Sequence, residues 1–330
     1  MKWKCLFSIL VFTSVNVNGQ SVHKNPDATF KIVGYYFLNA AIQDSAHTDS
    51  TFLFLNKITH LNIAFFNPDS NGAFKLNLAI DTLIKRAHNK NVKVLASIAG
   101  GGPHPVYRSL LKDDKRELFI NKLVQLVQHY NLDGIDVDIE GSDIDENYQN
   151  FVTELAGALR PLDKLITSAI ATAYKDQLPD KALQQFDFVN VMSYDRTGPW
   201  RPDDPGNHSP YQMAVEDLDY WHNERLIPEN KLVLGLPFYG YGFGPSGSQP
   251  VSMDYKSIVS LYPGNQSDTL HFPGNVTMYF NNLATIKQKT ALAIKRASGV
   301  MIWQILGDAP GDKSLLNTIN EVVNKKFRPH

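Results

Sequence analysis

The chain has 330 residues, of which 43% are hydrophobic and 20% are charged, and its formal net charge at pH 7 is -1. This length is enough for one large domain or two modest ones. The balanced charge gives no reason to expect nucleic acid or an anionic membrane surface as a partner.

The first residues predict a secretory signal peptide. Met1–Lys4 carries two lysines, an apolar run follows over Cys5–Val15, and the next residues are polar. This run is too short to cross a membrane and no later stretch is long enough. We therefore predict a signal peptide over residues 1–19, cleaved after Gly19, and a secreted or periplasmic protein. An apolar N-terminal strand is the alternative.

The single cysteine, Cys5, lies inside this predicted signal peptide. It stands at the start of the apolar run and not at the cleavage point, so we do not expect a lipid-anchored cysteine. Once Cys5 is removed, the mature chain has no cysteine, which excludes disulfides, thiol catalysis and cysteine-ligated metal sites.

After a polar linker over residues 20–29, short apolar runs alternate with amphipathic segments. The apolar runs are rich in Val, Ile, Phe and Tyr, which is typical of strands. The predicted strands are Lys31–Phe37, Ile58–Phe66, Val92–Ala99, Asp133–Glu140, Leu165–Ala171, Phe188–Tyr194, Leu232–Phe238 and Val300–Ile305. One-sided apolar spacing predicts helices over Lys112–His129, Glu146–Arg160, Asn282–Arg296 and Leu315–Val323.

Strands that alternate with helices imply parallel strands joined by crossovers. About eight such units predict a (β/α)8 TIM barrel of the α/β class. A doubly wound open sheet is the alternative, but no Gly-x-Gly-x-x-Gly follows the first strand. The longest gap separates the seventh and eighth strands. We interpret it as an elaborated loop of a single catalytic domain over residues 30–330, with a short helix near Asp254–Leu261 and a hairpin ending near Met278–Phe280.

The fourth predicted strand carries three acids on one face. Within Leu132–Glu140, apolar residues alternate with Asp136, Asp138 and Glu140, and period two separates the two sets onto opposite faces. A buried carboxylate is costly unless it is hydrogen-bonded or protonated. The three acids should titrate as a coupled set in which at least one pKa is raised, which is how a general acid stays protonated near neutral pH. An edge strand with a solvated acidic face is the alternative.

Other predicted strands place polar and aromatic groups beside these acids, because strand ends meet at the C-terminal face of a barrel. Met192 and Tyr194 share the inward face of the sixth strand, and Asp195 closes it at the rim. Ser97 is a small inward residue of the third strand. Trp303 on the eighth strand offers a flat apolar surface on which a sugar ring can stack, although plain core packing is the alternative for this residue.

At this point the sequence resembles a known family. Asp133–Glu140 matches the Asp-x-x-Asp-x-Asp-x-Glu signature of glycoside hydrolase family 18. Four further segments resemble other strands of that family, in the family's order: Lys93–Gly100, Met192–Asp195, Leu234–Tyr239 and Gly299–Trp303. The chain is therefore similar to a chitinase-type enzyme of family 18 over nearly its whole predicted mature length.

The resemblance implies substrate-assisted, retaining hydrolysis through an oxazolinium intermediate. It implies that Glu140 is the general acid and then the base, that Asp138 orients the substrate's acetamido group, and that Asp136 shares a proton with Asp138. Tyr194 would donate a hydrogen bond to the acetamido carbonyl. The expected substrate-binding residues are Tyr35, Ser97, Met192, Asp195, Trp200 and Trp303. For Trp200, which would line the leaving-group side, surface packing is the alternative.

The sequence departs from the family pattern at two places near this site. Ala99 replaces the first glycine of the third-strand motif, and Tyr241 stands where the family often has an arginine. The second change removes a charge that other members have at this position. Asp133, at the entrance of the fourth strand, is either a turn residue or a support for the acids.

Three functions agree with these residues. The first is a secreted chitinase that cleaves β-1,4-linked N-acetylglucosamine polymers. The second is an endo-β-N-acetylglucosaminidase that acts on the N-glycan core or on peptidoglycan-type glycans. The third is a catalytically inactive, lectin-like sugar binder, which retention of all three acids disfavours. We expect a monomer that binds such glycans without a metal or organic cofactor, and without nucleic acid or membrane partners.

Overall fold

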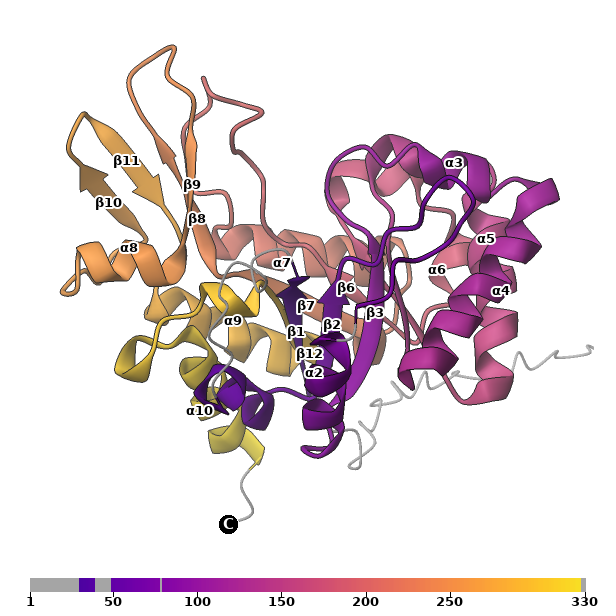
Figure 1. Cartoon of the computed structure of the whole chain (residues 1–330). Helices are drawn as coiled ribbons and strands as arrows, with labels where there is room; N and C mark the ends of the chain where they lie inside the picture. Colours follow the sequence, from indigo (N-terminus) through magenta and orange to yellow (C-terminus); the bar gives the residue numbers. More distant parts are fainter. Residues whose placement is uncertain (1–29, 39–48, 78, 328–330) are drawn as a thin grey trace, which may run out of the picture.

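The computed structural model describes residues 30–38, 49–77 and 79–327 (Figure 1). The predicted signal peptide and linker lie outside this part of the chain. Eight strands close into a parallel barrel in the order β1-β12-β7-β6-β5-β4-β3-β2, which confirms the predicted TIM barrel. The barrel strands are β1 (Lys31–Phe37), β2 (His60–Ala64), β3 (Lys93–Ala99), β4 (Gly134–Asp138), β5 (Leu165–Ile170), β6 (Phe188–Val191), β7 (Leu232–Pro237) and β12 (Gly299–Trp303).

Helices surround the barrel, with α4, α5 and α6 on one side and α9 and α10 on another (Figure 1). The predicted helices in the gaps between strands are present. The helices are α2 (Ala79–His88), α3 (Val106–Leu110), α4 (Asp113–Tyr130), α5 (Tyr148–Leu159), α6 (Asp180–Leu183), α7 (Tyr211–Asp219), α8 (Tyr255–Leu261), α9 (Leu283–Arg296) and α10 (Leu315–Phe327).

The alternation on β4 separates an apolar layer from a polar interior. Ile135 and Val137 are fully buried within the core between sheet and helices. In the same layer Phe119 of α4 stacks on Phe151 of α5, with ring centroids 5.8 Å apart. Burial of each such side chain contributes roughly 1.5–3 kcal/mol to stability. This layer fixes β4 with its carboxyl-bearing face toward the barrel axis.

The segment between β7 and β12 folds as a small sheet with one helix. Its strands are β8 (Tyr239–Phe243), β9 (Val251–Asp254), β10 (Thr269–Phe272) and β11 (Val276–Tyr279), paired antiparallel in the order β10-β11-β8-β9. The expected short helix is α8, and the expected hairpin is formed by β10 and β11. Strands β8 and β9 were not predicted, because their glycines and flanking proline give no strand signal. Figure 1 shows this sheet projecting beside one end of the barrel.

The ends of β6 and β3 shape the barrel mouth. β6 stops at Val191, three residues before its predicted end, because the Ser193 amide turns back to the Val191 carbonyl. Asp195 then adopts a left-handed conformation with φ 64°. At the end of β3, Ala99 is also left-handed, with φ 70°. The Ala99 amide donates hydrogen bonds to Asn67 Oδ1 (2.9 Å) and the Tyr107 hydroxyl (3.0 Å), which hold the turn.

Ala99→Gly is expected to stabilise the protein. A residue with a Cβ atom loses roughly 1–2 kcal/mol in the left-handed region, whereas glycine loses about 0.4–1 kcal/mol through the entropy of the unfolded chain. The free energy of unfolding should therefore rise by about 0.5–1 kcal/mol, measured in urea. Ala96→Gly, in the extended part of the same strand, is the control and should be destabilising. If both variants lost the same free energy of unfolding, the strain at Ala99 would be contradicted.

Candidate active site

β4 delivers three carboxyl groups to the barrel interior. Asp136 and Asp138 are 0% and 3% exposed. Glu140 follows the strand in an extended conformation, with φ -120° and ψ 154°, so the alternation continues and its half-buried side chain stays on the same face. The three acids thus rise from the barrel centre toward its C-terminal mouth.

Asp136 is the deepest of the three, and its oxygens accept four hydrogen bonds. The donors are the hydroxyls of Tyr35 (2.6 Å), Ser97 (2.8 Å) and Thr167 (2.6 Å) and the amide of Asn190 (3.3 Å). Burial raises the pKa of Asp136, and these four donors oppose that rise. Donors from β1, β3, β5 and β6 therefore fix one acid at the centre of the barrel.

Two expected substrate contacts lie in the layer of Asp136. Tyr35 is 1% exposed and Ser97 is 0% exposed, and both hydroxyls are donated to Asp136. A contact of either residue with substrate stays a prediction. They lie below the floor of the site, where they hold Asp136.

Asp138 and Glu140 form the pair nearest the mouth. Their carboxyl groups hydrogen-bond to each other. Burial and then the charges of Glu140 and Asp136 hold the pKa of Asp138 well above its usual value. Burial, and next the charge of Asp195, raises the pKa of Glu140 to about 7, while the hydrogen bond from Asp138 opposes this rise. The pair therefore retains a proton near neutral pH, as a general acid requires. No hydrogen bond joins Asp136 to Asp138 in the described structure, so proton sharing between those two stays a prediction.

Asp133 lies at the opposite end of β4 and serves the scaffold. Its Oδ2 accepts hydrogen bonds from the Val94 amide at 2.7 Å and from His88 Nε2 at 2.9 Å. These contacts tie the entrance of β4 to β3 and α2. Of the two possible roles for Asp133, the structure favours a structural one at the barrel base.

The end of β6 brings a phenol and a carboxylate beside the acid pair. Tyr194 is buried, and its hydroxyl lies 3.7 Å from Met301 Sδ on β12. Burial, followed by the nearby charges of Asp195, Asp138 and Glu140, holds the pKa of Tyr194 well above its usual value, so the phenol remains a donor. Half-buried Met192 packs on the aromatic cluster that contains Tyr194. Asp195 accepts a hydrogen bond from Tyr239 at 2.5 Å.

Trp303 is part of an aromatic platform at the mouth. Its ring is stacked on Phe65 with centroids 5.6 Å apart and 24° between the planes, and it also contacts Tyr35 and Phe37. Phe65 approaches β3 so closely that a Cβ atom at Gly100 would lie 2.4 Å from its ring. The glycine after Ala99 is thus required for the packing of this platform.

Trp200 lies in the loop after β6, at the exposed edge of the aromatic cluster that contains Tyr241. It is 54% exposed, and its ring contacts Tyr241 edge to face at 5.7 Å. Gly198 makes room for it, since a Cβ atom there would lie 2.6 Å from the indole. An exposed, oriented indole beside the mouth is available for stacking on a ligand.

Three residues at the site were not predicted. Tyr174, after β5, has a buried hydroxyl with no hydrogen-bond partner among the described residues, and burial followed by the charges of Glu140 and Asp138 holds its pKa well above its usual value. Phe65 supports Trp303, and His208 lies against Asp195 at 3.3 Å. Phe65 departs from the period-two pattern of β2, because it packs with Ala64 in the inner cluster while Ile63 lies in the outer core, so alternation gave no signal for it. Tyr174 and His208 come from loops, where no periodicity marks them.

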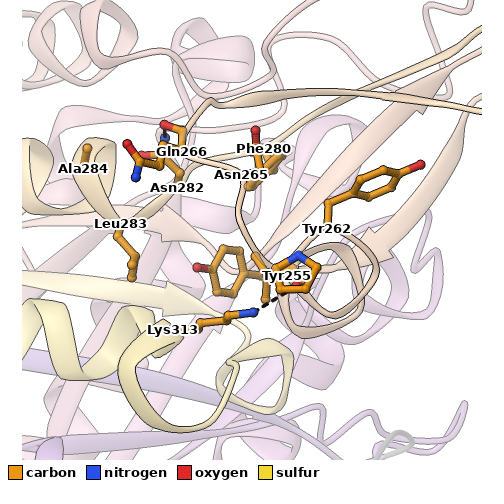
Figure 2. Close-up of a pocket in the computed structure, with 11 residues that line it drawn as sticks. Tyr255, Tyr262, Asn265, Gln266, Phe280, Asn282, Leu283, Ala284 and Lys313 are labelled. Carbon is orange, nitrogen blue, oxygen red and sulfur yellow. Dashed lines mark hydrogen bonds between the residues drawn. The ribbon is translucent and has the colours of Figure 1, made fainter.

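A cavity of about 330 Å³ lies outside the barrel mouth, at the base of the small sheet (Figure 2). Its wall includes Tyr255 and Val259 of α8, Asn282 and Leu283 at the start of α9, and Lys313. No carboxylate lines it, so it has no general acid for cleaving a glycosidic bond. We therefore assign the candidate active site to the barrel mouth.

The described residues hold neither a metal-binding cluster nor a membrane-spanning helix. Over residues 30–38, 49–77 and 79–327, no group of three or more His, Cys, Asp and Glu side chains is arranged to hold a metal ion. None of the helices in this part of the chain has the length and hydropathy needed to span a membrane.

Comparison with known proteins gives one family. The family model of glycosyl hydrolases family 18 matches residues 31–308. A GH18 chitinase from the chitin utilization locus of Flavobacterium johnsoniae has a similar structure, with TM-score 0.81, 31% identity and coverage of 91% of this chain and 95% of that one. A class V chitinase of Medicago truncatula is 25% identical over 329 residues, covering 83% of each chain. A chitinase-like agglutinin from Robinia pseudoacacia shares the fold, with TM-score 0.74, 23% identity and coverage of 88% and 99%.

Proposed function

This chain belongs to glycosyl hydrolases family 18, and from that premise we propose that it is a secreted chitinase. It cleaves β-1,4 bonds between N-acetylglucosamine units of chitin and chito-oligosaccharides. It does so with retention of configuration, through an oxazolinium ion formed by the substrate itself. The predicted signal peptide supports secretion, and the family's chitinases support the substrate class.

The acid pair is the observation that carries this proposal. Asp138 and Glu140 share a hydrogen bond at the barrel mouth, and the pKa of Glu140 is raised to about 7. A carboxyl group with that pKa is half protonated at neutral pH and can act first as an acid and then as a base. A lectin would gain nothing from such a pair, since burying it costs stability.

The reaction follows from the order of groups along the mouth. Glu140 donates its proton to the glycosidic oxygen, while the acetamido oxygen of the same sugar attacks C1 and the C1–O bond breaks. Asp138 accepts a hydrogen bond from the acetamido N–H and stabilises the positive charge of the oxazolinium ion. Tyr194 donates a hydrogen bond to the acetamido oxygen. Glu140, now ionised, takes a proton from water as that water attacks C1 and the bond between C1 and the acetamido oxygen breaks, which restores the acetamido group and the acid.

The surrounding groups hold the sugar for this chemistry. Trp303 provides the apolar floor against which the ring to be cleaved stacks. Met192 and Asp195 line the same subsite, and exposed Trp200 contacts the sugar on the leaving-group side. Binding energy from these contacts positions C1 between Glu140 and the acetamido oxygen.

The pH dependence of kcat/KM tests the state of Glu140. Because the pKa of Glu140 is raised from 4.5 to about 7, the carboxyl group is protonated below that pH and loses its proton above it. We therefore expect kcat/KM to fall as the pH rises through about 7. Asp195→Asn removes a charge that raises this pKa, so the alkaline limb should move to lower pH. The measurement is a pair of pH–rate profiles on chitohexaose, one for the wild type and one for Asp195→Asn. An alkaline limb at the same pH in both would contradict the assignment of this limb to Glu140.

The stereochemical outcome tests the mechanism. Chitohexaose is incubated with the protein, and the anomeric protons of new reducing ends are followed by NMR from the first minutes. A retaining reaction gives the β-anomer first, which then equilibrates with the α-anomer. Initial α-anomer would mean that water attacks directly, and it would exclude the oxazolinium route.

A further inference from the structure

His208 is a fully buried histidine that lies against the carboxylate of Asp195. It belongs to the loop between β6 and α7 and is 0% exposed. Its Nδ1 lies 3.3 Å from Asp195 Oδ1. The imidazole packs against the rings of Tyr239 and Tyr241, with both centroids 4.9 Å away, and these two rings also contact each other at 5.4 Å. The ring is therefore fixed in place with one nitrogen facing Asp195.

Stability alone does not explain a histidine at this position. Neither ring nitrogen has a hydrogen bond of good geometry with a described residue. A buried polar group left in that state costs about 1–3 kcal/mol, and such groups in native proteins call for another explanation. An apolar ring of the same size would fill the space beside the two tyrosines without this cost.

Asp195, by contrast, needs support. Its backbone is left-handed, with φ 64°, and its side chain remains 38% exposed. The Tyr239 hydroxyl is bound to Oδ1, the same oxygen that His208 faces. Tyr241, at the position where the family often has an arginine, also hydrogen-bonds to Asp195 but carries no positive charge. Within the described part of the chain, His208 is the basic side chain that comes within 4.0 Å of this carboxylate.

A hydrogen-bond network behind the loop holds His208 in its position next to Asp195. Lys289 of α9 is fully buried, and its Nζ donates hydrogen bonds to Ser209 O (2.6 Å), Ser209 Oγ (2.6 Å) and Asn281 Oδ1 (2.8 Å). Ser209 Oγ in turn donates to the Ser193 carbonyl at 2.6 Å. The two ends of the loop are thus clamped together beside Tyr194 and Asp195.

We propose that His208 is a positioning residue that holds the Asp195 carboxylate in the sugar subsite, where Tyr241 offers no positive charge to do so. This inference rests on the function proposed above. With a proton on Nδ1, the imidazole attracts Asp195 Oδ1 across 3.3 Å and restrains the carboxylate together with the Tyr239 hydroxyl. Asp195 is then kept facing the sugar and near Glu140 by a buried imidazole, and it needs no ion pair with an exposed cation.

A double-mutant cycle tests this role. His208→Phe keeps the ring and removes both nitrogens, so kcat/KM on chitohexaose should fall by about ten- to a hundredfold. His208→Asn returns a donor near the position of Nδ1 and should recover part of the loss. In an Asp195→Asn background, His208→Phe should cause no further loss beyond about twofold, because its effect passes through Asp195. The melting temperature of His208→Phe should be unchanged or higher.

Two results would overturn the proposal. Losses that multiply in the double variant would mean that His208 acts independently of Asp195, and a melting temperature that falls along with activity would mean that His208 serves only packing. His271→Phe, an exposed histidine on β10, is the matched control and should leave kcat/KM unchanged.

Crystal structures of the wild type and His208→Phe without substrate separate this proposal from the proposed function. We expect Asp195 to leave the Tyr239 hydroxyl and turn to solvent in the variant. An unmoved Asp195 refutes the positioning role whether or not the protein cleaves chitin. Absence of turnover by the wild type would overturn the chitinase proposal, and the position of Asp195 would still decide the role of His208.

Discussion

Glu140→Gln is expected to lower kcat on chitohexaose by about 10²- to 10⁴-fold, the range for loss of a general acid–base group. Glutamine has nearly the shape of glutamate but carries no proton that it can release. Protonation of the leaving oxygen and deprotonation of the attacking water are both lost. Because the half-buried side chain keeps its size, substrate should still bind, and KM should change little.

A matched control separates this effect from a general loss of charge near the mouth. Glu146 lies in the segment that follows β4 and is exposed. Glu146→Gln should retain full activity. If Glu140→Gln keeps more than about a tenth of the wild-type kcat, then Glu140 is not the general acid of this enzyme.

Asp138→Asn is expected to have the second largest effect, a loss of about 10²- to 10³-fold in kcat, as for removal of one preorganised electrostatic group. The carboxylate is 3% exposed and hydrogen-bonded to Glu140, so its charge acts at short range in a site with little water. The amide cannot stabilise the positive charge of the oxazolinium ion in the same way. Steady-state kinetics on chitohexaose measures the loss.

Asp133→Asn is the control for this second variant. It makes the same substitution just before the same strand, at the barrel base, where Asp133 binds the Val94 amide and His88. The melting temperature should fall in this variant while kcat remains close to that of the wild type. An Asp138→Asn protein with undiminished kcat would show that the reaction needs no second carboxylate at this position.

The barrel and its acids could be predicted because both depend on local periodicity. Eight apolar runs alternate with amphipathic segments, and the structure has a barrel strand in each run. On β4, period two alone places Asp136 and Asp138 opposite Ile135 and Val137, and burial confirms that division. The strong apolar face leaves the strand no other orientation.

Depth within the barrel could not be predicted in the same way. Tyr35 and Ser97 were expected to touch substrate because they share the inward face with the acids. Both lie in the layer of Asp136, below the mouth, and are donors to it. Period two gives the face of a residue, but its layer depends on the stagger of neighbouring strands, which no single strand encodes.

Loop residues of the site depended on contacts that form only when the barrel closes. His208 reaches Asp195 because the loop after β6 folds back and is clamped by Lys289 of α9, 80 residues further along the chain. Tyr174 likewise enters the site from the loop after β5. No hydrophobic period marks such positions, since the partners that fix them are remote in sequence.

The most direct test of the central claim is the product profile of the purified mature protein on chitohexaose, with an N-glycosylated protein as the second substrate. We predict shorter chito-oligosaccharides from the first and no released glycan from the second, with cleavage lost in Glu140→Gln. Release of N-glycans while chitohexaose stays intact would contradict the chitinase assignment and move it to the glycan core. No turnover of either substrate would contradict enzymatic function on these glycans and leave a sugar-binding role for the acids.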